Sequence, residues 1–295
     1  MKKILMFIFT TVTLFGFNIN KYTIESGCFV KNNQEYRVLR GFNYKNTHYN
    51  VVVNTSSLKS YIVQSPKNRV GCNKFSRYVK LLNLSASKPY PLQNDGITHA
   101  NRGLYLTTDL CPSSKKGFED RLYKAIIKNF KNPVPVTLFI TKRWILKHKK
   151  EFNQLKEWQK ENRLNIIWGN HTAKHIYHPK MPLDKNFVLS KEENLEKDIL
   201  DNEKYLIENG VVPSVFFRFP GLVSNRDTIL KVKKFGLITI GSNAWLAKGE
   251  NIKEGSIILV HGNKNEPKGV DIFLKLLKDK KIKSLNSLYN LQWSI

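Results

Sequence analysis

The chain has 295 residues, of which 41% are hydrophobic and 12% aromatic; this suits one large domain, or one medium domain with a small companion, and excludes wholesale disorder. Its net charge of +26 favours an acidic partner such as nucleic acid, anionic lipid or an acidic cell-wall polymer. We expect no dedicated nucleic-acid surface, because the lysines are scattered along the whole chain and neither zinc-finger spacing nor an aromatic RNA-binding signature is present.

The amino-terminal stretch begins with two lysines and continues with an almost uncharged apolar run over residues 4–17. This pattern is typical of a secretory signal peptide, and the run is shorter than the roughly 20 residues of a membrane-spanning helix. No small-x-small cleavage site is obvious, so residues 1–20 are either a signal peptide or an uncleaved anchor that associates with a membrane. We therefore expect an exported protein, located in the periplasm, in the cell envelope or outside the cell.

Residues 21–100 are rich in Asn, Ser, Thr, Tyr and Val and alternate in places between apolar and polar residues, which predicts a small β-rich module without a chemical signature. Residues 87–97 read as a loop or linker, with two prolines and an Asp-Gly turn signal. Because an exported protein can keep disulfides, Cys28 and Cys72, both in this region, are the favoured pair, which leaves Cys111 over.

Residues 101–295 have a different sequence pattern, in which apolar runs alternate with amphipathic segments. Ser190 and Glu193 have the spacing of a capping box, and Gly210 suits a helix carboxyl end. Strands alternating with helices predict an α/β fold with a parallel sheet or barrel. We expect strands at 103–109, 134–141, 164–170, 214–220, 237–242 and 255–262, and helices at 117–130, 144–162, 190–210, 226–236 and 269–281.

One candidate functional side chain falls at the end of each of five predicted strands. Because the carboxyl ends of parallel strands meet at one rim, we expect these side chains to form a single site. They are Asp109, His171, Arg218, Trp245 and His261.

The segment "HTAKH" contains two of the seven histidines, His171 and His175, four residues apart. On a helical turn this spacing places both rings on one face, as a divalent metal requires. Thr172 between them either caps the turn or fixes a ligand. His178, next to Pro179, is interpreted as a structural or supporting residue.

The order of these residues resembles the polysaccharide deacetylases of the NodB-homology type, carbohydrate esterase family 4, over roughly residues 103–280. Each motif alone is weak, but five motifs in the family's order are fairly specific. The second motif, His-Ser/Thr-x-x-His, matches at His171, Thr172 and His175, the third at Arg218 and Pro220, the fourth at Trp245, and the fifth at His261.

The resemblance implies a distorted (β/α) barrel and a divalent metal, with zinc favoured, bound by His171 and His175. It also implies a hydrolase that cleaves the non-peptide carbon–nitrogen bond of an N-acetyl group. Asp109 would be the general base, His261 the general acid, and Arg218 the cation that orients the base. Metal polarisation of a poorly electrophilic amide carbonyl makes this chemistry coherent.

Three departures from the family pattern bear on the site. Leu110 occupies the position of the third metal ligand, Gly221 replaces a tyrosine that serves through its backbone N–H, and Ala244 replaces an aspartate that tunes the acid histidine. The metal is then held by two histidines and water, or Asp109 turns to it, or Asp120 reaches in; we favour Asp109 near the metal as base, ligand or both. Cys111 offers a soft thiolate, but a buried or disulfide-linked role is favoured.

The leading hypothesis is an exported metal-dependent deacetylase of an N-acetylated polysaccharide, with a peptidoglycan-like glycan favoured. The alternative is an inactive or weakly active glycan-binding descendant of the same fold, motivated by Leu110. A third hypothesis, binding to nucleic acid or a membrane surface through charge alone, predicts steep salt dependence without any effect of pocket mutations. The oligomeric state is left open.

Overall fold

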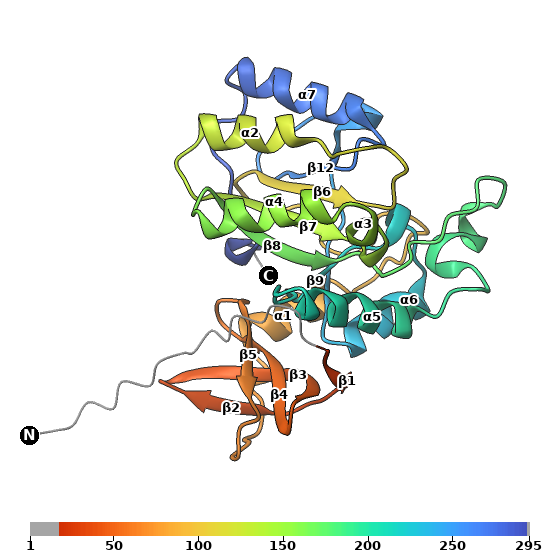
Figure 1. Ribbon diagram of the computed structural model, residues 1–295. Coiled ribbons are helices and arrows are strands. Elements are labelled where there is room, and N and C mark those ends of the chain that lie inside the picture. The colour runs from red at the N-terminus through yellow and green to blue at the C-terminus, as the bar shows by residue number, and fades with distance from the viewer. Residues whose placement is uncertain (1–17, 294–295) are drawn as a thin grey trace, which may run out of the picture.

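The computed structural model describes residues 18–293, so the predicted apolar run over residues 4–17 lies outside the described part of the chain. Two sheets make up the molecule, a small antiparallel one followed by a larger parallel one (Figure 1). Within residues 18–293, none of the helices combines the length and the apolar character needed to cross a membrane.

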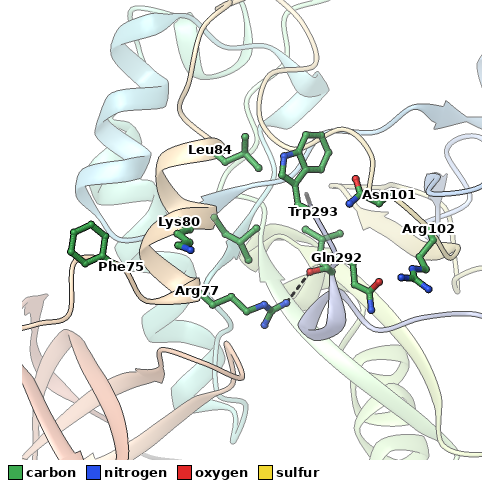
Figure 2. A pocket seen from close by; sticks show the side chains of 10 residues that line it. Phe75, Arg77, Lys80, Leu84, Asn101, Arg102, Gln292 and Trp293 are labelled. Carbon is green, nitrogen blue, oxygen red and sulfur yellow. Dashed lines mark hydrogen bonds between the residues drawn. The ribbon is translucent and has the colours of Figure 1, made fainter. Parts of the chain in front are cut away.

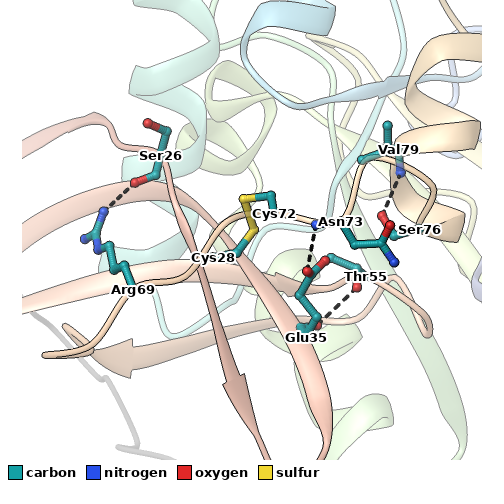
Figure 3. Close-up of a disulfide and its surroundings, with 9 residues drawn as sticks. All are labelled: Ser26, Cys28, Glu35, Thr55, Arg69, Cys72, Asn73, Ser76 and Val79. Atoms are coloured by element: carbon teal, nitrogen blue, oxygen red, sulfur yellow. Dashed lines mark hydrogen bonds between the residues drawn. A yellow bond between two sulfur atoms is a disulfide. The ribbon is translucent and has the colours of Figure 1, made fainter.

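The antiparallel sheet has five strands in the order β1-β3-β4-β5, and β2 also pairs with β3. A disulfide joins Cys28 at the start of β2 to Cys72 in the segment after β5, which confirms the predicted pair (Figure 3). Beside it, the backbone N–H of Asn73 donates to the Glu35 carboxylate at 2.8 Å. The strands are β1 Asn20–Ile24, β2 Cys28–Lys31, β3 Gln34–Tyr44, β4 Thr47–Asn54 and β5 Ser60–Gln64.

The parallel sheet has seven strands in the order β10-β9-β8-β7-β6-β12-β11. It curls into the predicted distorted (β/α) barrel, and its edge strands β10 and β11 have no pairing with each other in the described chain, so the barrel is open. The strands are β6 Tyr105–Leu110, β7 Val134–Ile140, β8 Leu164–Asn170, β9 Phe216–Phe217, β10 Ile238–Thr239, β11 Ala244–Trp245 and β12 Ile257–His261.

The segment before β6 lies across the open side of this barrel. Ile97 bridges to Ile240 beside β10, and His99 bridges to Ser256 beside β12. The residues just before β6 are therefore part of the barrel wall and supply hydrogen bonds that the edge strand β10 would otherwise lack.

Helices cover the barrel and bury their apolar faces against it; α2, α4 and α7 lie side by side over β12, β6, β7 and β8 (Figure 1). On α2, Leu122, Tyr123 and Ile126 are buried at helical spacing. The helices are α1 Arg77–Leu84, α2 Asp120–Asn129, α3 Lys142–Lys147, α4 Lys149–Lys160, α5 Leu195–Glu208, α6 Arg226–Lys234 and α7 Pro267–Lys278, with short 3₁₀ turns η1 Leu183–Lys185, η2 Phe187–Leu189, η3 Pro220–Leu222, η4 Leu246–Lys248 and η5 Leu288–Asn290.

Two helix boundaries differ from the prediction. The single helix expected at 144–162 is divided at His148, whose ring nitrogens lie 3.1 and 2.9 Å from the carbonyl oxygens of Trp144 and Lys115 while its backbone leaves the helical region. The predicted capping box at Ser190 is wrong, because α5 begins at Leu195 and the Asn194 side chain accepts the N–H of Lys197 instead. Asn is as effective an N-cap as Ser, so the later residue suffices.

The two sheets are joined by a buried ion pair. Arg40 of β3 is 2% exposed and donates to both carboxylate oxygens of Glu203 on α5, at 2.7 and 3.0 Å. It also donates to the carbonyl oxygen of Phe235 at 2.8 Å, and Tyr22 donates to Glu203 at 2.9 Å. Each buried charge is therefore fully bonded, and losing either partner would leave the other uncompensated.

A hollow of about 610 Å³ lies at the amino end of β6 (Figure 2). It is bordered by α1, residues 101–102 and residues 291–293. Arg77 of α1 donates to the carbonyl oxygen of Leu291 at 3.0 Å and ties these walls together. This hollow lies at the opposite end of β6 from Asp109 and is separate from the rim where the predicted site residues meet.

Candidate metal centre and its surroundings

The predicted residues Asp109 and Arg218 meet at the carboxyl ends of β6 and β9. The Arg218 guanidinium is fully buried and donates to Asp109 Oδ1 at 2.8 Å. Its other donors reach the Thr107 hydroxyl at 2.8 Å and the carbonyl oxygens of Ile240 and Gly241 at 3.2 and 2.8 Å. The guanidinium is thereby held rigidly, and it fixes one oxygen of Asp109 while the other faces His171.

His171 and His175 also come together, with ring centroids 4.9 Å apart. The helical turn expected between them is wrong, because Thr172 and His175 both have positive φ, 66° and 50°. The Thr172 hydroxyl accepts the backbone N–H of His175 at 3.2 Å, so it caps this turn, which is one of the two roles predicted for it. A tight non-helical loop therefore achieves the closeness that four-residue spacing achieves on a helix.

Two side chains that the sequence analysis did not assign to the site form hydrogen bonds with the backbone of this loop. The Asp198 carboxylate on α5 accepts the backbone N–H groups of Ala173 and Lys174 at 3.2 and 3.1 Å. The Asn170 amide oxygen accepts the N–H of Thr172 at 2.9 Å. The loop is thus positioned by buried acceptors rather than by helical hydrogen bonds.

Cys111 lies beside the two histidines and is a free, buried cysteine. Its Sγ is 3.5 Å from His171 Nε2. Burial alone would raise the pKa of the Cys111 thiol, but His175, His171 and His261 together lower that pKa well below its ordinary value. Burial was predicted for Cys111; its place beside the histidines was not favoured.

The donor atoms present fit a divalent metal. The sulfur of Cys111 and one nitrogen each of His171 and His175 lie within 4.8 Å of one another. His171 Nδ1 is 2.8 Å from the carbonyl oxygen of Arg218, which leaves Nε2 as the metal-facing atom. His175 Nε2 is buried and has no hydrogen-bond partner among the described residues. Because buried polar atoms are normally paired, this nitrogen is suited to bind a metal.

Asp109 stands next to this cluster but is not a member of it. Its Oδ2 lies 3.7 Å from His171 Nε2. Asp120 lies elsewhere, at the exposed start of α2, where it pairs with Lys124 at 2.5 Å. His178 also lies apart, with its ring 3.7 Å from the Glu192 carboxylate.

On the other side of the cluster, the His261 ring pairs with a carboxylate absent from the predictions. His261 Nδ1 lies 2.7 Å from Glu266 Oε2, and Trp245 Nε1 donates to the same oxygen at 2.9 Å. Burial lowers the pKa of His261, but its interactions with Cys111 and Glu266 outweigh burial and raise that pKa well above its ordinary value. Glu266 thus supplies the carboxylate that the Ala244 position lacks.

The remaining predicted residues line the same rim. Pro220 and Gly221 form the 3₁₀ turn η3 after Arg218. Gly221 has φ +62°, and a Cβ there would lie 2.5 Å from the Phe187 ring, so glycine is required for both reasons. The sequence departure at Gly221 is therefore matched by Phe187, which fills the space above it.

Comparison with known proteins places this arrangement in a family. Residues 96–240 match the family model described as polysaccharide deacetylase. The chain carries a polysaccharide deacetylase domain. The predictions of this family, of its distorted barrel fold and of a hydrolase of polysaccharide acetyl groups are thereby confirmed.

Solved structures to which the chain is similar include a family 4 carbohydrate esterase from Bacillus anthracis, with 21% identity, a TM-score of 0.48, and 72% of this chain and 90% of that chain covered. A chitin deacetylase from Colletotrichum lindemuthianum has 16% identity, a TM-score of 0.47, and coverage of 68% and 92%. A CE4 family pseudoenzyme from Bacillus anthracis has 14% identity, a TM-score of 0.46, and coverage of 90% and 88%.

Proposed function

We propose that this protein is an exported, metal-dependent deacetylase that removes N-acetyl groups from a cell-wall or surface polysaccharide, with a peptidoglycan-like glycan favoured. The observation that carries the proposal is the meeting of three elements at one rim. These are the donor cluster containing His171 and His175, the Asp109–Arg218 pair, and the His261–Glu266 pair. A glycan-binding descendant without activity has no need of all three.

Asp109 is suited to be the general base. Arg218 fixes Oδ1 at 2.8 Å, while Oδ2 faces the histidine cluster, where an attacking water would stand. Oδ2 takes the proton of that water as the oxygen attacks the acetyl carbon. A bound divalent cation, with zinc favoured, would supply polarisation of the acetyl carbonyl and lower the pKa of the attacking water.

His261 is suited to be the general acid on the opposite side of the cluster. Glu266 lies against Nδ1 and stabilises the protonated ring, which leaves Nε2 to donate. When the carbon–nitrogen bond breaks, Nε2 delivers its proton to the departing amine nitrogen. The products are acetate and a free amino group on the sugar.

Features around the rim support a glycan as the substrate. Exposed Tyr177, in the segment that projects between β8 and α5 (Figure 1), stacks on Phe187, which in turn packs against His175. An aromatic face next to the cluster suits the apolar face of a sugar ring. A hollow of about 90 Å³ beside Trp245 adds the amide, hydroxyl and charged side chains of Gln93, Asn94, Ser242, Lys248 and Glu250.

Export is supported by the lysine-led apolar run over residues 4–17 and by the Cys28–Cys72 disulfide, which suits an oxidising compartment. Fractionation of producing cells tests it, with detection of the protein outside the cytoplasm as the expected result.

The deciding experiment measures acetate release from N-acetylglucosamine polymers, with and without added zinc, for the wild type and His171→Ala. We expect zinc-dependent release that the variant loses. Equal activity in both proteins would refute the metal mechanism. Absence of activity on every glycan, with no bound metal, would favour the glycan-binding alternative.

A further inference from the structure

We propose that Cys111 is the third protein ligand of the metal, so that this site is a Cys–His–His centre. The assignment rests on the proposed metal-dependent function and deepens it. The position next to Asp109 in the sequence, Leu110, is fully buried among the apolar residues between the sheet and its covering helices. The next candidate ligand is therefore Cys111, one residue further along the chain.

The alternation of the strand explains the change of position. Successive side chains of a strand point to opposite faces, so Asp109 and Cys111 share a side while Leu110 faces the other. The Leu110 carbonyl oxygen accepts the Thr141 N–H at 3.3 Å and its hydroxyl at 3.1 Å, which holds the end of β6 in place. Asn263 Nδ2 donates to the Cys111 carbonyl oxygen at 2.8 Å and fixes the next residue.

The cluster has the composition of a catalytic metal site. Three protein ligands with a fourth position open to water and substrate are typical of catalytic zinc, and cysteine sulfur is a strong zinc ligand. A soft thiolate selects zinc over hard cations such as magnesium, manganese and calcium. The thiol is 6% exposed, so bulk solvent reaches it poorly while the two imidazoles face it directly.

A rival role for Cys111 is that of a nucleophile activated by His171, whose Nε2 is 3.5 Å away. The orphaned His175 Nε2 argues against it, because a cysteine–histidine pair leaves that second buried nitrogen without a purpose. The two roles differ in one measurable respect, since only the metal ligand changes the metal's spectrum.

The test uses the full chain, stripped with a chelator and reloaded with either zinc or cobalt(II). Metal content, affinity and the thiolate-to-cobalt charge-transfer absorption are measured for the wild type, Cys111→Ser and Cys111→Asp. Asp120→Asn is the matched control, because Asp120 is an exposed acid outside the cluster. Circular dichroism and thermal unfolding show that each variant is folded.

We expect one metal per wild-type chain, with the charge-transfer band. Cys111→Ser loses the band and binds metal at least about tenfold more weakly, a loss of at least about 1.4 kcal/mol. Cys111→Asp binds metal without the band, and Asp120→Asn matches the wild type. Wild-type affinity in Cys111→Ser, or a metal-loaded wild type without the band, overturns the assignment.

The failures of the two proposals are distinguishable. A wild type that shows the band but releases no acetate from any polymer refutes the deacetylase function and supports the ligand assignment. Cys111→Ser with full metal content but no acetate release, together with covalent acyl transfer to the wild-type thiol, overturns the assignment in favour of the nucleophile.

Discussion

Replacing Leu110 by aspartate tests whether the missing metal ligand can be restored at the position that the family motif assigns to it. By position in the family motif, this change restores the missing metal ligand. In the structure, the Leu110 side chain is fully buried, and it lies close enough to Gly262 that a Cβ added there would be 2.9 Å from its Cδ2. We therefore expect Leu110→Asp to place a carboxylate in the apolar core, where no metal can reach it.

The expected cost follows from two terms. Removing a buried leucine side chain costs about 2–5 kcal/mol, and an unpaired buried carboxylate adds several kcal/mol. A sum of at least about 5 kcal/mol is comparable to the entire stability of many domains. Leu110→Asp should therefore be unfolded or insoluble.

Urea denaturation followed by circular dichroism tests this expectation: Leu110→Asp should show no cooperative unfolding transition, and Leu146→Asp is the matched control. Leu146 is 54% exposed on α3, so its replacement should change stability by no more than about 0.5 kcal/mol. Cys111→Asp, one residue further along, should fold and bind metal. A folded Leu110→Asp that binds metal as tightly as Cys111→Asp would refute the reasoning.

Three further predictions concern charge and covalent linkage. Glu266→Gln should lower the pKa of His261, so the loss of kcat with rising pH moves to lower pH; an unmoved alkaline limb in the kcat profile would contradict the acid role. Burial and a neighbouring carboxylate raise the pKa of Glu193 from 4.5 to about 7, so the wild type should lose stability as pH rises through this window. Because Glu193 is partly exposed, Glu193→Gln should recover only about 1 kcal/mol at pH 8 and nothing at pH 4, by urea unfolding at both pH values. Replacing Cys28 and Cys72 together by serine should cost up to about 4 kcal/mol, given their separation of 44 residues; unfolding that matches the non-reduced wild type would count against this.

The sequence predicts the barrel because short, mostly apolar runs lie between polar turns and amphipathic segments, as at Ile257–His261, which begins with four apolar residues. It also predicts that Asp109, His171, Arg218 and His261 meet, because parallel strands place their carboxyl ends at one rim. These features depend on side-chain pattern, which sequence displays directly.

The pattern of apolar and polar residues does not reveal backbone dihedral angles or contacts between residues far apart in the sequence. The positive φ values at Thr172 and His175 replace the expected helical turn and depend on Asp198, 25 residues after Ala173. Glu266 forms an ion pair with His261 across a turn of the loop that follows β12, in a role the motif assigns to another position. The sequence signal for this pair is an acidic residue, Glu266, five positions after the histidine at the end of a strand. The position of the Cys111 side chain depends on whether the alternation of side chains along β6 continues beyond Leu110.

Helix α5 joins the amino-terminal sheet to the ligand loop. Glu203 on this helix holds Arg40 of the small sheet, while Asp198, just over one turn earlier, holds the loop that carries His171 and His175. An isolated barrel cut out by truncation would lose Arg40 and Tyr22, the partners that hold Glu203 on the helix that supports its metal ligands. A minimal catalytic fragment that keeps the small sheet therefore also keeps the contacts that position α5 under the ligand loop.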